Sequence, residues 1–208
     1  LASLMLLSVI CSAIYANAVG NAFQYDDRHS IVENGHIRSL ANIPAFFSHP
    51  EYFSRDEEKA MYRPLLLATF ALNHFWSGYE TWSYHLVNIL LHALASIVVW
   101  LLFIELRLSV CLALLGGVLF AVHPLATEPV NYISSRSELM ASLFLMASLW
   151  LYLCSEPGKS VPAGRSLLAR FASVGCFAAA LGSKEIGIVL PALMLMTDRL
   201  DGRRWRTQ

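Results

Sequence analysis

Charged residues are scarce in this sequence of 208 residues. Asp, Glu, Lys and Arg make up 14% of it, whereas hydrophobic residues make up 56%; a soluble domain carries about a quarter charged residues. The 15 basic and 15 acidic side chains cancel, so no basic excess is left to neutralise the phosphates of a nucleic acid. These absences argue against a soluble domain and against a nucleic-acid partner, and they indicate an integral membrane protein.

Cysteine is also scarce, and its spacing matches no metal-binding pattern. The four cysteines lie in or beside apolar runs, with no CxxC pair and no histidine at ligand spacing: Cys11, Cys111, Cys154 and Cys176. We expect them to be small core hydrophobes rather than disulfides or metal ligands. The sequence also lacks internal repeats and low-complexity tracts, which predicts one polytopic helical unit.

Long hydrophobic runs are what the sequence has instead. Because about 20 apolar residues cross a bilayer, the runs predict about six spans, at 1–19, 84–104, 108–122, 137–154, 166–182 and 186–197. The shorter run 64–76 starts at a proline, which favours a helix start, and predicts a helix lying in the interface. The expected fold class is an all-α polytopic membrane bundle with amphipathic surface helices in the first long loop, 20–83.

The first run has an alternative interpretation. Ala16-Asn17-Ala18 fits the small-x-small pattern of a signal-peptidase site, so cleavage competes with a spanning helix. The chain starts at Leu1 without a methionine and stops at Gln208 after a basic cluster. We therefore expect it to be a fragment of a longer protein.

Basic residues in the short links give the orientation. Arg107, the segment 159–170 and the segment 199–206 fall on one side if the spans alternate, and Lys and Arg mark the cytoplasmic side. The loops 20–83 and 123–136 and the turn 183–185 are then extracytoplasmic. The short loops favour a bacterial inner membrane over the endoplasmic reticulum, although both membranes would impose similar hydrophobic lengths.

Charged residues from separate loops are expected to gather on the extracytoplasmic side. They are Asp26, Asp27, Arg63, Glu128, Arg136, Lys184 and Glu185. Adjacent carboxylates shift each other's pKa and suit a general base, while cations beside them suit a phosphate. The alternatives are a solvated turn for the two aspartates and interfacial anchoring for the basic side chains.

Metal dependence stays open in the sequence. Asp26, Asp27 and His123 would hold a divalent ion only if the protein depends on one, and no cofactor is certain. His85 and His92 share one helix face with Asn88, but seven residues rise about 10 Å along a helix, too far to share an ion. Helix–helix hydrogen bonding is therefore their expected role.

An ordered set of motifs carries a family resemblance. The motifs are YDD, IVENGHI, YRPL, HLVNILLH, LFAVHPLATEPVNYISSRSELM and SKEIGIVLP. The set runs from about Phe23 to Asp198 and resembles the N-terminal membrane region of the transmembrane and tetratricopeptide-repeat O-mannosyltransferase family, within the GT-C glycosyltransferases. The remaining spans and the repeat domain of that family are not part of this chain.

The resemblance implies an enzyme that moves mannose or a similar sugar from a polyprenyl-phosphate carrier to a protein hydroxyl on the extracytoplasmic side, with inversion. Its residue roles map onto this chain as follows: Asp26 and Asp27 for the catalytic carboxylate, with Asp26 favoured, Glu128 for a second acidic residue, Lys184 for a phosphate contact, and Arg63 and Arg136 for phosphate or sugar contacts. The implied partners are the bilayer, the lipid-linked sugar and an acceptor protein.

Two other functions compete with this interpretation. A catalytically inactive membrane anchor for a repeat-type interaction domain would keep the same spans. A membrane transporter would place ionisable residues in mid-membrane, whereas the charges here cluster at the ends of the apolar runs. The sequence therefore favours the enzyme.

Overall fold

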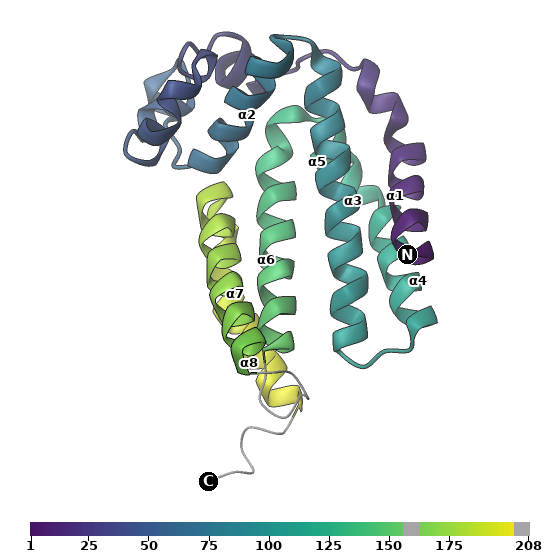
Figure 1. Ribbon diagram of the computed structural model, residues 1–208. Helices are drawn as coiled ribbons and strands as arrows, with labels where there is room; N and C mark the ends of the chain where they lie inside the picture. Colours follow the sequence, from purple (N-terminus) through teal and green to yellow (C-terminus); the bar gives the residue numbers. More distant parts are fainter. Residues whose placement is uncertain (156–162, 202–208) are drawn as a thin grey trace.

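The computed structural model describes residues 1–155 and 163–201, and within these ranges the regular structure is entirely helical. The α-helices are α1 (Ala2–Tyr15), α2 (Pro64–Ser77), α3 (Thr81–Glu105), α4 (Val110–Ala121), α5 (Thr127–Asn131), α6 (Arg136–Cys154), α7 (Ala163–Ser183) and α8 (Leu190–Asp201). The long helices form a bundle with irregular turns gathered at one end (Figure 1). The predicted all-α class is confirmed.

Short helical turns connect the α-helices. They are η1 (Ala16–Gly20), η2 (Arg28–Val32), η3 (His36–Arg38), η4 (Leu40–Phe47), η5 (Pro50–Phe53), η6 (Glu57–Lys59), η7 (Pro124–Ala126), η8 (Ile133–Ser135) and η9 (Glu185–Val189). The turn η2 has π-helical hydrogen bonds and the others are 3-10 helices. The turns η1 to η6 all lie between α1 and α2.

Four helical segments of the described ranges are long and apolar enough to cross a membrane: Ala2–Gly20, Thr81–Glu105, Ile133–Cys154 and Gly164–Ser183. The pair Val110–Ala121 and Pro124–Asn131 passes the same test together but is bent by 47°, because a proline ends the first helix there. Several spanning helices make this a polytopic membrane protein.

The last predicted span, 186–197, falls on two short helical elements. The segment 186–197 begins in the 3-10 turn η9, and α8 that follows has 12 residues. A helix of that length rises about 18 Å, less than the hydrocarbon thickness of about 30 Å. The run 108–122 corresponds to the first arm of the bent pair. In both places the apolar run is longer than the regular α-helix that it contains.

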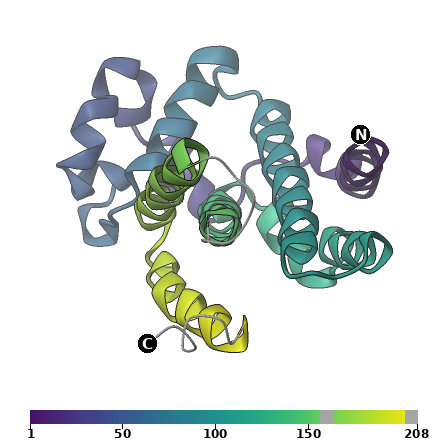
Figure 2. The same cartoon turned by 60° about the horizontal axis from the view of Figure 1, so that its bottom comes forward.

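Helices α6 and α3 form the centre of the bundle. Helix α6 packs between α7 and α3, and α3 also contacts α4 and α1 (Figure 2). At Gly117 of α4, a Cβ would come within 3.1 Å of Trp100 Cβ and 3.3 Å of the Ser96 carbonyl oxygen. A glycine here lets the α4 backbone approach α3 closely.

The loop between α1 and α3 folds into a compact head, which we define as residues 21–77. Its turns bury Ile31, Ile37 and Phe46 against Phe70 of α2, which gives the head a small hydrophobic core of its own. The predicted run 64–76 is α2, whose end exposes Phe75 and Trp76. In Figure 1 the head lies beyond the upper ends of α6 and α7.

Buried polar side chains join α3 to the connecting segments. His85 Nε2 lies 3.2 Å from the Asn21 carbonyl oxygen, and His92 Nε2 lies 3.0 Å from that of Ala121. Asn88 donates to the carbonyl oxygens of Val130 and Tyr132, each at 3.4 Å. The hydrogen-bonding role expected for this stripe is confirmed, and it holds the segment 121–132 against α3.

Candidate functional site

A polar cavity of about 270 Å³ lies where the head meets the ends of α6 and α7. Of the predicted site residues, Asp26, Arg63, Glu128 and Lys184 line it. They come from the head, from α5 and from the link after α7, so the fold brings together segments far apart in the sequence. Asp27 and Arg136 are not among its lining residues.

Asp26 presents its carboxylate to this polar cavity. Its side chain is 65% exposed, and its Oδ1 lies 3.2 Å from His29 Nε2. Its backbone is held from both sides, because its N–H donates to the Tyr132 hydroxyl oxygen at 2.8 Å and its carbonyl accepts from the Ser30 hydroxyl at 2.6 Å. A fixed backbone and an accessible carboxylate suit a group that accepts a proton from a ligand.

Asp27 is enclosed, only 1% exposed. Its Oδ2 accepts from the Gln24 N–H at 2.9 Å, and its Oδ1 accepts from both the N–H and the hydroxyl of Ser134. Burial raises the pKa of the Asp27 carboxyl, an effect that the donors on Ser134 and Gln24 partly offset and the charge of Asp26 reinforces. Asp27 therefore ties the start of the head to the segment before α6.

His29 and Tyr132 also line the polar cavity, and the sequence reasoning missed them. His29 Nδ1 lies 3.0 Å from the Ser54 hydroxyl oxygen, which itself accepts from the Asp56 N–H at 2.9 Å. The Ser54 hydroxyl can therefore donate a hydrogen bond to Nδ1, and the protonated Nε2 then donates to Asp26. The signal was available, because His29 follows Asp26 by three residues, one helical turn.

Tyr132 stands at the wall of the polar cavity. Burial raises the pKa of Tyr132 to about 12, so its hydroxyl is neutral near pH 7. Its ring meets that of Tyr25 edge-on, with the ring centroids 6.4 Å apart. Tyr25 has a φ of 40°, a left-handed conformation that costs a residue with a side chain about 1–3 kcal/mol.

Three basic side chains, those of Lys184, Arg63 and Lys59, line the polar cavity and are opposite in charge to Asp26 and Glu128. Lys184 Nζ lies 2.8 Å from Glu138 Oε1, and Arg63 Nη2 lies 3.6 Å from Glu185 Oε1. The Glu185 backbone N–H, with smaller contributions from Arg63 and Lys184, holds the pKa of the Glu185 carboxyl below its usual range. Arg63 Nε is enclosed without a hydrogen-bond partner among the described residues.

Arg136 was predicted as a phosphate or sugar contact, but the structure encloses it completely. Its guanidinium donates to Asn88, to Asn73 and Thr69, and to the Tyr84 carbonyl oxygen, at 2.6–3.1 Å. It also lies 4.9 Å from the centroid of the Phe70 ring. Arg136 therefore joins α2, α3 and α6 from inside, with each of its guanidinium nitrogens hydrogen-bonded.

Asp26, Asp27 and His123 were expected to hold an ion only if the protein depends on a metal, and the structure does not bring them together. The described residues contain no group of three or more His, Cys, Asp or Glu side chains placed to hold an ion. His123 lines a different cavity, and its Nδ1 accepts from the Leu125 N–H at 3.2 Å. Asp27, as described above, already accepts from its protein neighbours. Neither residue is placed to complete a set with Asp26.

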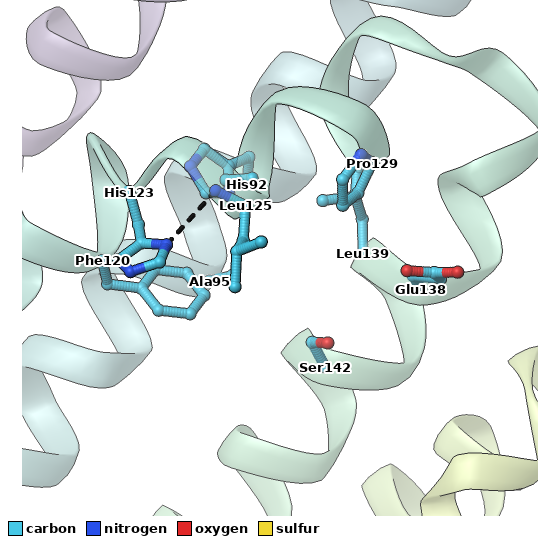
Figure 3. A pocket seen from close by; sticks show the side chains of 10 residues that line it. His92, Ala95, Phe120, His123, Leu125, Pro129, Glu138, Leu139 and Ser142 are labelled. Atoms are coloured by element: carbon cyan, nitrogen blue, oxygen red, sulfur yellow. Dashed lines mark hydrogen bonds between the residues drawn. The ribbon is translucent and has the colours of Figure 1, made fainter.

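A second, apolar cavity has a volume of about 280 Å³, and Figure 3 shows its lining side chains. Phe120, Leu125 and Leu139 line it, together with His92 and His123. Glu138, the partner of Lys184, lines both cavities. The apolar cavity and the polar cavity, with its basic side chains, therefore meet at the Glu138 carboxylate, next to helices that cross the membrane.

These features define a polytopic helical membrane protein with a polar site at the ends of its helices. No family model and no solved structure matches the chain. It is 35% identical over 164 residues to Protein O-mannosyl-transferase tmtc2 of Xenopus laevis, covering 76% of the chain and 19% of the relative. For Protein O-mannosyl-transferase TMTC3 of Homo sapiens the identity is 32% over 168 residues, covering 77% and 18%.

Protein O-mannosyl-transferase TMTC2 of Homo sapiens is matched over 208 residues, 92% of the chain and 23% of the relative, at 33% identity. The chain belongs to the family of these transmembrane O-mannosyltransferases, as its motifs predicted. It spans about a fifth of the length of the curated relatives it matches. The expected bacterial inner membrane finds no support, because these relatives come from animals.

Proposed function

We propose that this chain carries the reaction site of a glycosyltransferase that moves mannose from a polyprenyl-phosphate carrier to a protein hydroxyl, as the names of its relatives suggest for the acceptor and the sugar. One observation carries the proposal: Asp26 and Glu128 line the same polar cavity as Lys184 and Arg63. The site combines a proton acceptor with groups that bind a phosphate, which are the two requirements of this transfer.

Asp26 acts as the general base. Its carboxylate accepts the proton of the acceptor hydroxyl while the hydroxyl oxygen attacks the anomeric carbon of the sugar. The bond from that carbon to the phosphate oxygen breaks, and its electron pair leaves with the lipid phosphate. A single displacement of this kind inverts the anomeric configuration and needs no enzyme-linked sugar.

Lys184 and Arg63 stabilise the departing phosphate, whose negative charge grows as the bond to the sugar breaks. Cations aimed at developing charge lower the barrier most in a site shielded from water. Lys184 exchanges Glu138 for the phosphate when the donor binds, since their 2.8 Å contact lies at the wall of the cavity. Glu128 contacts the sugar or the acceptor from the opposite segment.

The adjacent apolar cavity supports a lipid as the carrier of the sugar. Its lining of Phe120, Leu125 and Leu139 (Figure 3) suits the first isoprene units, and Glu138 lines both this cavity and the polar one. We assign the site to the extracytoplasmic side, because Arg107, Arg165 and Arg199 lie at the other ends of their helices. The animal relatives favour the endoplasmic reticulum membrane over a bacterial one.

The direct experiment reconstitutes the full-length protein that contains this chain and supplies dolichyl-phosphate mannose with a Ser- and Thr-containing peptide. The proposal expects transfer, with the mannose linked in the configuration opposite to that in the donor. Retention of configuration would contradict a single displacement. Absence of transfer with correctly folded protein would favour an inactive anchor instead.

A further inference from the structure

A third cavity, of about 400 Å³, adjoins the polar cavity and has a different chemistry. Asn21, Gln24, Thr127 and Asn131 line it, and we call it the amide cleft. Glu128 and Tyr132 line both the amide cleft and the polar cavity. The two spaces therefore share a wall next to Asp26, whose backbone N–H is bound to the Tyr132 hydroxyl.

The lining of the amide cleft suits a ligand that carries no phosphate. Its amide side chains each offer both a donor and an acceptor, and no Lys or Arg is among its lining residues. A phosphate would need such cations, whereas a peptide backbone alternates N–H and C=O groups that amides can match. The amide oxygen of Asn131 is enclosed and has no hydrogen-bond partner among the described residues, so an N–H donor from a ligand would satisfy it after a small rotation.

The walls of the amide cleft are held from behind. The Asn21 carbonyl oxygen accepts from buried His85, the Gln24 N–H donates to buried Asp27, and Asn88 donates to carbonyl oxygens around Asn131. The backbone is thus fixed by the bundle, while the side chains of Gln24 and Thr127 stay exposed. A preorganised surface of this kind binds a flexible ligand at a lower entropic cost.

Tyr25 adds an aromatic surface at the edge of this region. Its side chain is 86% exposed and its ring packs edge-on against Tyr132. An exposed aromatic ring held by a left-handed backbone, with a φ of 40°, directly before Asp26 is the kind of strained feature that points to a ligand contact. Tyrosine supplies a large contact area to peptides at little entropic cost.

From this arrangement we propose that the amide cleft binds the backbone of an extended acceptor polypeptide, with Tyr25 packed against it, and that a Ser or Thr hydroxyl passes Tyr132 to reach Asp26. This inference rests on the proposed function, since it names the acceptor subsite of the same reaction. Lys184 and Arg63 line the polar cavity but not the amide cleft. The acceptor therefore arrives from a wall that does not carry the leaving phosphate, as an inverting displacement requires.

The test uses the full-length protein and a fluorescent Ser- and Thr-containing peptide, with binding measured in the absence of donor and initial rates measured with dolichyl-phosphate mannose. The double variant Gln24→Ala, Tyr25→Asn removes an amide and the ring, and asparagine tolerates the positive φ of residue 25. We expect its peptide Kd and peptide KM to rise about tenfold, which corresponds to about 1.4 kcal/mol, at an unchanged donor KM. Asn17→Ala is the matched control, because Asn17 is exposed at the same end of the bundle and lines none of these three cavities.

Unchanged peptide binding and peptide KM in the double variant would overturn the inference, and so would a rise in donor KM alone, which would assign the amide cleft to the sugar. These outcomes are separable from a failure of the proposed function. Peptide binding that weakens in the variant, without transfer by the wild type, would support the subsite and contradict the transferase. Mannose transfer with the same peptide KM in the wild type and in the variant would support the transferase and contradict the subsite.

Discussion

Asp26 and Asp27 are neighbours in the sequence but occupy opposite environments. Asp26 faces the polar cavity, whereas Asp27 is buried and accepts three hydrogen bonds from Gln24 and Ser134. An asparagine at position 27 has one acceptor oxygen, so at least one donor would lose its partner, at a cost of about 1–3 kcal/mol. We expect Asp27→Asn to lower the Tm of the full-length protein, and Asp26→Asn to leave it unchanged, in thermal unfolding followed by fluorescence.

The Tm loss expected for Asp27→Asn should depend on pH, and the pKa of Asp27 gives the direction. Burial raises the pKa of Asp27 above its unfolded value, so the folded protein holds this proton more tightly than the unfolded chain does. The contribution of Asp27 to stability is then largest below the unfolded pKa and falls as pH rises through the raised one. The Tm loss caused by Asp27→Asn should therefore grow as pH falls through the raised pKa towards the ordinary value of 3.8; a constant or shrinking loss would contradict this.

His29 orients the proposed base. Its Nε2 lies 3.2 Å from Asp26 Oδ1 while Ser54 holds Nδ1, so it positions one carboxylate oxygen and leaves the other for the acceptor. We expect His29→Ala to lower kcat about tenfold, the equivalent of about 1.4 kcal/mol for one charge-assisted hydrogen bond, with little change in either KM.

His29→Gln is the conservative control for that experiment, because its amide can still donate a hydrogen bond to Asp26. Partial recovery of kcat, with a pH profile shifted from that of the wild type, would support a positioning role. Equal loss in both variants together with a lower Tm would indicate that His29 serves only to hold the head together.

Among the elements, the turn η9 sets the place of Lys184. A Cβ at Gly187 would come within 3.0 Å of the Leu181 nitrogen and 3.1 Å of Ala180 atoms, most of them backbone that cannot move away easily. Gly187→Ala should push η9 away from α7 and carry Lys184 away from Glu138. We expect a lower Tm and a higher KM for dolichyl-phosphate mannose, measured by initial rates.

Gly175→Ala is the matched control in α7, where a Cβ would have no neighbour within 4 Å. An alanine inside an exposed helix stabilises it by about 1 kcal/mol relative to glycine, so this variant should keep or raise its Tm and keep its donor KM. Equal effects of the two substitutions would contradict a specific role for the η9 contact.

Some helices could be predicted from the sequence, whereas the bends and turns between them could not. Apolar runs predicted α3 and α6 closely, because their length and composition alone decide whether a helix suits a bilayer. The bend at Pro124 and the 3-10 turn before α8 depend on packing between segments, which hydropathy does not encode. Motifs brought Asp26, Glu128 and Lys184 to notice, but burial separates Arg136 from them, and burial follows only from how the head and the helices pack.

At the scale of the whole molecule, the bundle and the head have separate tasks. The spanning helices hold the start of α6 and the segment 121–132 at one level through buried contacts of Arg136 and Asn88. Lys184, in the link after α7, pairs with Glu138 of α6. The head then places Asp26 against that frame through Asp27 and Ser134. Three adjoining cavities result, one apolar, one charged and one lined by amides, which match the lipid, the reacting groups and the acceptor of the proposed transfer.

The most direct test of this account is the rate of mannose transfer by the full-length protein carrying Asp26→Asn. Asp56→Asn is the control, because Asp56 is also an exposed aspartate of the head but does not line the polar cavity. Loss of a general base lowers a rate by about 10²–10⁴-fold, so we expect such a loss in Asp26→Asn at an unchanged Tm and near wild-type transfer in Asp56→Asn. Undiminished transfer by correctly folded Asp26→Asn would contradict the account.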